Sequence, residues 1–187
     1  DGKDYHSMKP EELRKHIAMV PQQVNLFSGT IRENLLLADP DADDQTLMEA
    51  VKEAGLLKFV QSLEKGLNSD VGNAGASLSG GQRQKIGIAR ALLSKAEYMI
   101  FDEATSSVDP ESEKEIWETI GHLAHTRTLI IISHRMSSVR GADCIYVLKD
   151  GRVAQQGDHE TLMAQDGLYH ELEYASRQWR WQNETKI

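Results

Sequence analysis

Two neighbouring carboxylates stand directly after an apolar run in the second half of the chain. Asp102 and Glu103 follow residues 98–101, which predict a buried strand. Ligands bind at the carboxyl ends of strands in α/β sheets, so Asp102 could hold a Mg²⁺ ion and Glu103 could polarise an attacking water as a general base. A strand end followed by a helix-capping acid is the structural alternative, and this pair alone does not decide between the two.

A pair of glycines, Gly80 and Gly81, stands where a helix should begin, directly after Ser79. Glycine inside a helix costs about 1 kcal/mol, so a pair at a helix start points to a special purpose. Without Cβ atoms the backbone N–H groups can approach an anion closely, the helix dipole favours the same charge, and Ser79 adds a hydroxyl donor. A flexible loop before a helix is the alternative for these three residues alone.

Two further polar residues follow apolar runs. His134 comes just after residues 128–132, and Gln22 comes just after residues 17–20. A histidine at a strand end can reach a phosphate oxygen or orient a water molecule, although a lone histidine is more often structural.

Taken together and in order, these residues resemble the ATPase domain of ABC transporters. Gln22 matches the Q-loop of that family, and residues 78–82 (Leu-Ser-Gly-Gly-Gln) match its signature motif. Residues 98–102 match the Walker B strand, Glu103 the catalytic glutamate, residues 106–109 (Ser-Ser-Val-Asp) the D-loop and His134 the H-loop. Five motifs in this order, with Glu103 counted as part of the Walker B motif, cover nearly all of residues 1–172 and make the resemblance specific.

The resemblance implies ATP and Mg²⁺ as cofactors and a role for each matched residue. Glu103 would act as the general base, and His134 would contact the γ-phosphate. Asp102 and Gln22 would serve the metal. The groups offered to the nucleotide would be Gln22, the D-loop residue Asp109, and the signature residues Ser79, Gly80, Gly81 and Gln82.

Two segments narrow the resemblance to ABC exporters. Residues 27–35 look like the segment that follows the Q-loop in exporters, and residues 70–75 look like their X-loop, which touches the transmembrane domain. Asn73 stands where exporters usually have a Glu, which is a departure from the X-loop pattern. The implied partners are a second ABC ATPase domain, identical or different, and a transmembrane domain, with the chain at the cytoplasmic face of the membrane.

The expected fold is α/β and P-loop NTPase-like (RecA-like), with a mostly parallel sheet and an inserted α-helical subdomain that carries the signature motif. The pattern assigns residues 1–25 and 96–158 to the ATPase core, 26–95 to the helical subdomain, and 159–187 to C-terminal helices and a tail. Strands separated by helices predict a parallel sheet covered on both faces, with residues 144–148 as a further strand. Asp150-Gly151 predicts a hairpin turn.

The family's phosphate-binding P-loop, Gly-x-x-x-x-Gly-Lys-Ser/Thr, does not occur in the 187 residues. We therefore expect that the chain begins after the P-loop helix, that strands of the sheet precede it, and that ATP binding by the chain alone is absent or very weak. Two ABC ATPase domains bind ATP between the P-loop of one and the signature motif of the other. This chain retains the groups offered to the partner's nucleotide.

Composition limits the other function classes. The net charge of -8 argues against a broad nucleic-acid surface, and no apolar run is long enough to span a bilayer. Cys144, the single cysteine, is expected to be an inert core thiol, and the tail from residue 177, with Trp179 and Trp181, has no clear periodicity. Two alternatives stay open, namely a soluble ABC ATPase of the translation-factor or DNA-repair kind and a non-catalytic module that binds a partner domain.

Overall fold

The computed structural model describes residues 4–184, with side chains described as far as residue 176. The chain divides into two compact units, Asp1–Ile132 and Ser133–Ile187. Each unit has its own hydrophobic core.

The first unit is built on a parallel sheet of three strands, ordered β1 (Ile17–Val20), β2 (Tyr98–Asp102) and β3 (Thr128–Ile132). Val20 pairs with Phe101, and Asp102 pairs with Ile132, so the three strands end at the same edge. The parallel strands and the α/β class predicted from the sequence are therefore confirmed.

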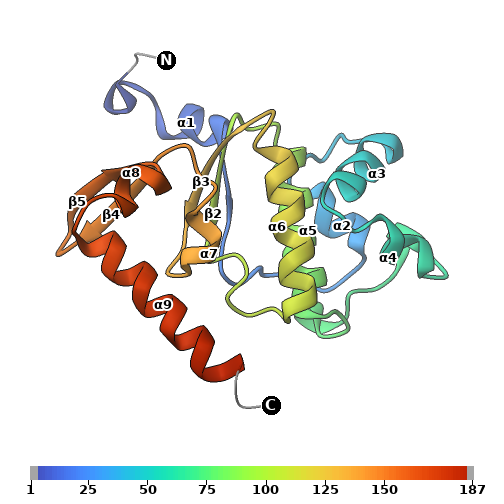
Figure 1. Ribbon diagram of the computed structural model, residues 1–187. Coiled ribbons are helices and arrows are strands. Elements are labelled where there is room, and N and C mark those ends of the chain that lie inside the picture. Colours follow the sequence, from blue (N-terminus) through green and yellow to red (C-terminus); the bar gives the residue numbers. More distant parts are fainter. Residues whose placement is uncertain (1–3, 185–187) are drawn as a thin grey trace. The chain divides into compact units, whose positions relative to one another are not determined.

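Helices surround one face of this sheet. The helices of the first unit are η1 (Tyr5–Ser7), α1 (Pro10–His16), α2 (Ile31–Leu36), α3 (Asp44–Glu53), α4 (Leu57–Ser62), η2 (Gly66–Asn68), η3 (Asn73–Gly75), α5 (Gly80–Leu93) and α6 (Pro110–Leu123). The long helices α5 and α6 lie side by side next to the strands (Figure 1).

The other face of the sheet carries the half-exposed side chains of Met19, Ile130 and Ile132. Within residues 4–132, the first unit covers one face of its sheet, so the expected cover on both faces is not found in this unit. The strands advance in one direction, β1-β2-β3, and right-handed connections between such strands place their helices on the same face.

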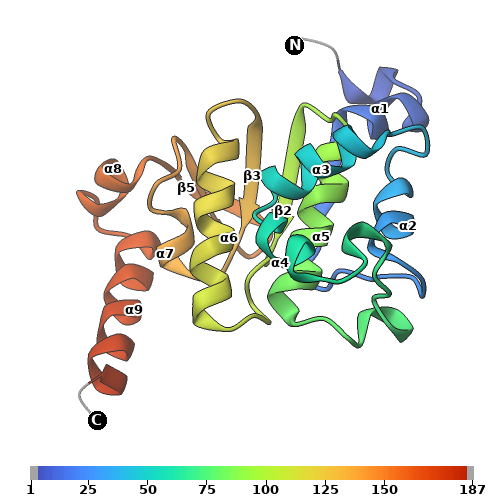
Figure 2. The same cartoon turned by 90° about the vertical axis from the view of Figure 1, so that its right-hand side faces the viewer.

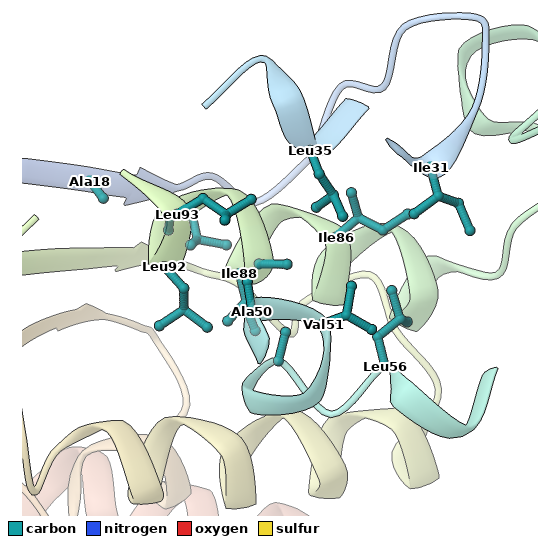
Figure 3. Close-up of a cluster of buried hydrophobic side chains, with 14 of the residues drawn as sticks. Ala18, Ile31, Leu35, Ala50, Val51, Leu56, Ile86, Ile88, Leu92 and Leu93 are labelled. Atoms are coloured by element: carbon teal, nitrogen blue, oxygen red, sulfur yellow. The ribbon is translucent and has the colours of Figure 1, made fainter. Parts of the chain in front are cut away.

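Helix α5 is the centre of the first core. Ten of its fourteen residues are buried. Figure 3 shows Leu35 of α2 pointing toward Ile86 of α5, with Val51 of α3 and Leu56 gathered nearby. Figure 2 shows α5 between α6 and α2. A helix buried on most sides is held firmly, so its two ends are fixed relative to each other.

The second unit contains α7 (Met136–Val139), a hairpin of β4 (Ile145–Lys149) and β5 (Arg152–Gly157), α8 (His159–Met163) and α9 (Leu168–Glu184). The turn residues Asp150 and Gly151 have φ of 50° and 74°, as a two-residue hairpin turn requires, which confirms the predicted turn. Ile145, Val147 and Tyr169 are among the residues of its core.

Two expectations about this part of the chain are wrong. The strand at 144–148 pairs in antiparallel fashion with β5, as the predicted hairpin requires, but in the described residues it does not join the parallel sheet, contrary to the expectation. Cys144 is exposed rather than a core thiol, because it lies just before β4 and only alternate residues of that strand are buried. The tail, whose sequence has no clear periodicity, is helical as far as Glu184, so Trp179 and Trp181 lie within α9, and their side chains fall outside the described part.

Within residues 4–184, no helix is both long and apolar enough to cross a membrane.

Candidate nucleotide site

The predicted chemical residues of the first unit gather where its strands end. Gln22 lies two residues after β1 and donates from Nε2 to Ser106 Oγ over 3.0 Å. Asp102 is the last residue of β2, and Glu103 follows it, both half-buried. The Q-loop residue is thereby joined to the segment that follows the two carboxylates, across 84 residues of sequence.

Glu103 has a strained backbone. Its φ of 46° lies in the left-handed region, which residues with a Cβ adopt at a cost of about 1–3 kcal/mol. Its N–H donates to Ile132 O over 2.9 Å, which extends the pairing of β2 and β3 by one residue. Strain of this kind persists where the surroundings fix it, and it clusters at functional sites.

The signature residues begin α5 through a capping box. Ser79 Oγ accepts from Gln82 N over 3.1 Å, and Gln82 Oε1 accepts from Ser79 N over 2.9 Å. A hydroxyl group has one hydrogen and two lone pairs, so Ser79 can accept this bond and still donate another. The Ser-x-x-Gln spacing is the sequence signature of a capping box and could have predicted it.

Gly80 and Gly81 lie against the segment after Ser106. A Cβ atom on Gly80 would stand 2.9 Å from Ser107 O. A Cβ atom on Gly81 would stand 2.4 Å from Ser112 Oγ and 2.5 Å from Ser112 Cβ. Glycine at these positions therefore allows α5 to approach this segment closely, a reason that the sequence alone did not reveal.

Asp109 begins α6 as its N-cap. Its Oδ1 accepts from Ser112 N over 2.9 Å, and this hydrogen bond lowers the pKa of the Asp109 carboxyl below its usual value of 3.8. The carboxylate side chain of Asp109 is exposed, so it caps the helix and faces solvent at the same time. A salt bridge between buried Lys85 of α5 and Glu115 of α6, which sequence reasoning missed, also joins the two helices.

The two segments that pointed to exporters lie side by side. Ile31 N donates to Ser69 O over 3.0 Å, and Val71 N donates to Gly29 O over 2.9 Å. Asn73, the departure from the exporter pattern, accepts at Oδ1 from Ser28 Oγ over 3.3 Å. The structure thus pairs residues 28–31 with residues 69–73.

A family model described as ABC transporter matches residues 1–106 of the chain, which is more than half of it. The chain belongs to the ABC transporter family. The resemblance stated from the motifs, and the P-loop NTPase-like α/β fold that it implied, are thereby confirmed.

Similar proteins place the ABC chain among exporters. It is 41% identical over 172 residues to an ATP-dependent lipid A-core flippase 1 of Colwellia psychrerythraea, covering 92% of the chain and 29% of the flippase. It is 44% identical over 174 residues to the ABC-type transporter fsqE of Aspergillus fumigatus, covering 92% of the chain and 14% of that protein. A bacterial Atm1-family ABC exporter solved with ATP bound matches with a TM-score of 0.87 and 37% identity, covering 95% of the chain and 31% of the exporter. The chain therefore spans about three tenths of the flippase and of the exporter, and less of the fungal protein.

Among the predicted ABC site residues, the structure shows two separate sets of contacts within the first unit. Gln22 is joined to Ser106, and residues 79–82 pack against residues 107–112. His134 is exposed and is the second residue of the second unit, two residues after β3, so its place in the site stays a prediction. In the described part of the chain, no three His, Cys, Asp or Glu side chains gather as a metal site.

Proposed function

We propose that this chain is the ATP-binding and ATP-hydrolysing part of an exporter-type ABC transporter. The observation that carries the proposal is the packing of residues 79–82 at the start of α5 against residues 107–112, just after Glu103. This packing fixes an anion-binding helix N-terminus relative to a candidate general base. The relatives' names, an ATP-dependent flippase and an exporter with ATP bound, support the same activity.

The metal role belongs to Asp102 and Gln22. Gln22 uses its amide N–H on Ser106, so its Oε1 oxygen remains suited to a cation. Oxygen ligands fit Mg²⁺, and two of them suffice only when phosphates and water complete the shell, so the residues fit a nucleotide-bound ion. Bound Mg²⁺ neutralises charge on the transferred phosphoryl group. In this assignment Glu103 would accept a proton from the attacking water, and His134 would contact the γ-phosphate.

The signature residues serve a nucleotide held by a second ABC ATPase domain. The first N–H groups of a helix have no partner within the helix, so Gly80 and Gly81 can donate theirs to phosphate, together with the Ser79 hydroxyl. Gln82 holds this end of the helix in shape through the capping box. The phosphate cradle itself is a P-loop, which these 187 residues do not contain.

The transmembrane partner is contacted by residues 26–95, which form the helical subdomain. Phe27 and Leu37, on either side of α2, are 65% and 57% exposed, and such large apolar side chains suit a protein contact. Asp109 of the D-loop lies at the face toward the second ATPase domain. The whole assembly acts at the cytoplasmic face of the membrane.

The proposal is tested by Glu103→Gln in the assembled transporter. We expect ATP hydrolysis to fall by about 10²-fold or more while ATP binding persists, because a neutral amide cannot accept the proton. The matched control is Glu118→Gln on the exposed surface of α6, which should hydrolyse ATP at the wild-type rate. Hydrolysis by Glu103→Gln at the control rate would remove the assigned general base.

A second measurement uses the 187-residue chain alone. A fluorescent ATP analogue should show no tight binding without an added partner domain. Tight binding by the isolated chain would contradict the assignment of the phosphate cradle to a P-loop.

A further inference from the structure

The loop after β1 lies along one side of α5 and is held there at three places. Gln84 of α5, only 3% exposed, donates from Nε2 to Pro21 O over 2.9 Å. Gly87 faces Val24 so closely that a Cβ atom would stand 2.5 Å from Val24 Cγ2. Arg90 donates from Nη1 to Asn25 O over 2.7 Å. Residues three apart share a side of a helix, so Gln84, Gly87 and Arg90 form a continuous line, the α5 seam.

Arg90 also reaches the next part of the same loop through Asn34. Its Nε donates to Asn34 O over 2.8 Å, and its Nη2 donates to Asn34 Oδ1. Asn34, at 1% exposure, holds both backbone groups of Phe27: its Oδ1 accepts from Phe27 N, and its Nδ2 donates to Phe27 O, each over 2.9 Å. The same Nδ2 donates to Thr30 O over 2.9 Å. The exposed side chain of Phe27 therefore projects from a backbone segment that the buried Asn34 side chain holds in place.

The charge of Arg90 is partly buried and has only neutral acceptors in this network. Partial burial lowers the pKa of the Arg90 guanidinium, and the acceptors that it reaches on Asn25 and Asn34 are neutral oxygens. Hydrogen bonds offset the cost of removing a charge from water, and the planar guanidinium fork can address several oxygens in fixed directions. The network therefore specifies where the loop lies on α5 more than it adds net stability.

We propose that Arg90 and Asn34 are positioning residues that couple the signature motif to the partner-facing loop. Helix α5 begins at the signature residues 79–82 and carries the seam further along, while the loop has Gln22 at one end and Phe27 at the other. A displacement of the α5 N-terminus on nucleotide binding is passed through the seam to Phe27, and from there to an apolar segment of the transmembrane partner. The coupling role rests on the proposed function, whereas the clamp on the loop does not.

The clamp is tested in the 187-residue chain by amide hydrogen exchange. Arg90→Lys keeps a positive charge but loses the fork, so the Phe27 amide and residues 24–29 should exchange about tenfold faster or more, with α6 unchanged. The matched control is Arg32→Lys, because Arg32 bonds Asp44 and Asn68 rather than the loop. Equal exchange at Phe27 in Arg90→Lys and Arg32→Lys would overturn the clamp.

A second variant separates a local effect on the loop from a general loss of folding. Asn34→Asp keeps an oxygen for Arg90 and Phe27 N but removes the Nδ2 donors to Phe27 O and Thr30 O. We expect faster exchange in residues 27–30 while α5 and α6 stay as protected as in the wild type. Wild-type exchange in residues 27–30 would contradict the role of Asn34.

The coupling role is tested in the assembled transporter with the same Arg90→Lys variant. Basal ATP hydrolysis and the KM for ATP should stay at wild-type values, whereas stimulation of hydrolysis by transported substrate should fall severalfold. If Arg90→Lys kept full stimulation of ATP hydrolysis by substrate while residues 24–29 exchanged fast, the proposal that the α5 seam transmits a displacement to Phe27 would be overturned. A wild-type transporter without any ATP hydrolysis would overturn the proposed function and the coupling role, while the exchange experiment would still decide the clamp.

Discussion

Gly81→Ala should destabilise the chain, because the new Cβ atom has no room. It would stand 2.5 Å from Ser112 Cβ, whereas carbon atoms in contact are at about 3.5–4.0 Å, so α5 and α6 must separate locally by about 1 Å. A rotation about χ1 moves Ser112 Oγ away but leaves its Cβ in place. Overpacking of this kind costs about 1–3 kcal/mol, and removing a helical glycine returns at most about 1 kcal/mol. We expect a net loss of about 1–2 kcal/mol in the free energy of unfolding, measured by urea denaturation.

The matched control is Gly121→Ala in α6, where the added Cβ would meet no atom within 4 Å apart from its chain neighbours and the nearby backbone of its own helix. This change should stabilise the chain by about 0.5–1 kcal/mol, since glycine loses more backbone freedom on folding. Ser112→Gly removes both clashing atoms and should restore most of the stability of Gly81→Ala. If Gly81→Ala were as stable as Gly121→Ala, the packing argument for the signature glycine would be refuted.

Three other outcomes follow from the structure. The Asp109 carboxyl has a lowered pKa in the folded chain, so its contribution to the free energy of unfolding is complete above the ordinary value of 3.8 and is lost as the pH falls through the folded-state pKa. Asp109→Asn keeps the helix cap but removes the titrating group, so it should flatten the acid side of a curve of stability against pH. Arg140→Met removes the guanidinium from the fully buried Glu173 and should cost about 3 kcal/mol in urea denaturation, a loss that a surface pair would not show. Cys144 should react with Ellman's reagent in the folded chain at the rate of an exposed thiol, and a requirement for urea would contradict its exposure.

The strands of the first unit could be predicted because their residues form short apolar runs bounded by polar ones. Residues 17–20, 98–101 and 128–132 lie in three neighbouring parallel strands, and the order of the motifs in the sequence is sufficient to indicate the family. Local signals also sufficed for the hairpin turn at Asp150-Gly151.

The hairpin of β4 and β5 shows where a local pattern misleads. Residues 145–148 are all apolar, so they resemble a strand buried on both faces. In the structure Ile145 and Val147 point to the core while Tyr146 and Leu148 are exposed. Alternation was present in the fold but hidden in the sequence, because the outward positions are apolar too. Cys144 was misplaced for the same reason.

The contacts that organise the site could not be predicted, because they join residues far apart in the sequence. The bond from Gln22 to Ser106 and the bonds from Arg90 to Asn25 and Asn34 span 56 to 84 residues. No periodicity or local spacing identifies such pairs. Conversely, the capping box at Ser79 and the one at Thr30 both have the expected spacing and could have been predicted from it.

The direction in which a Cβ atom on Gly81 would point decides how activity measurements on signature-motif variants should be interpreted. A Cβ atom on Gly81 would point at Ser112 of the same chain. A loss of ATP hydrolysis in Gly81→Ala is therefore explained first by the clash with Ser112, and only then by an effect on phosphate binding. The N–H group that would face phosphate is still present in alanine. We therefore expect Gly81→Ala with Ser112→Gly to recover most of the hydrolysis lost by Gly81→Ala in the assembled transporter. Recovered stability without recovered hydrolysis would show that the glycine is required by the nucleotide itself.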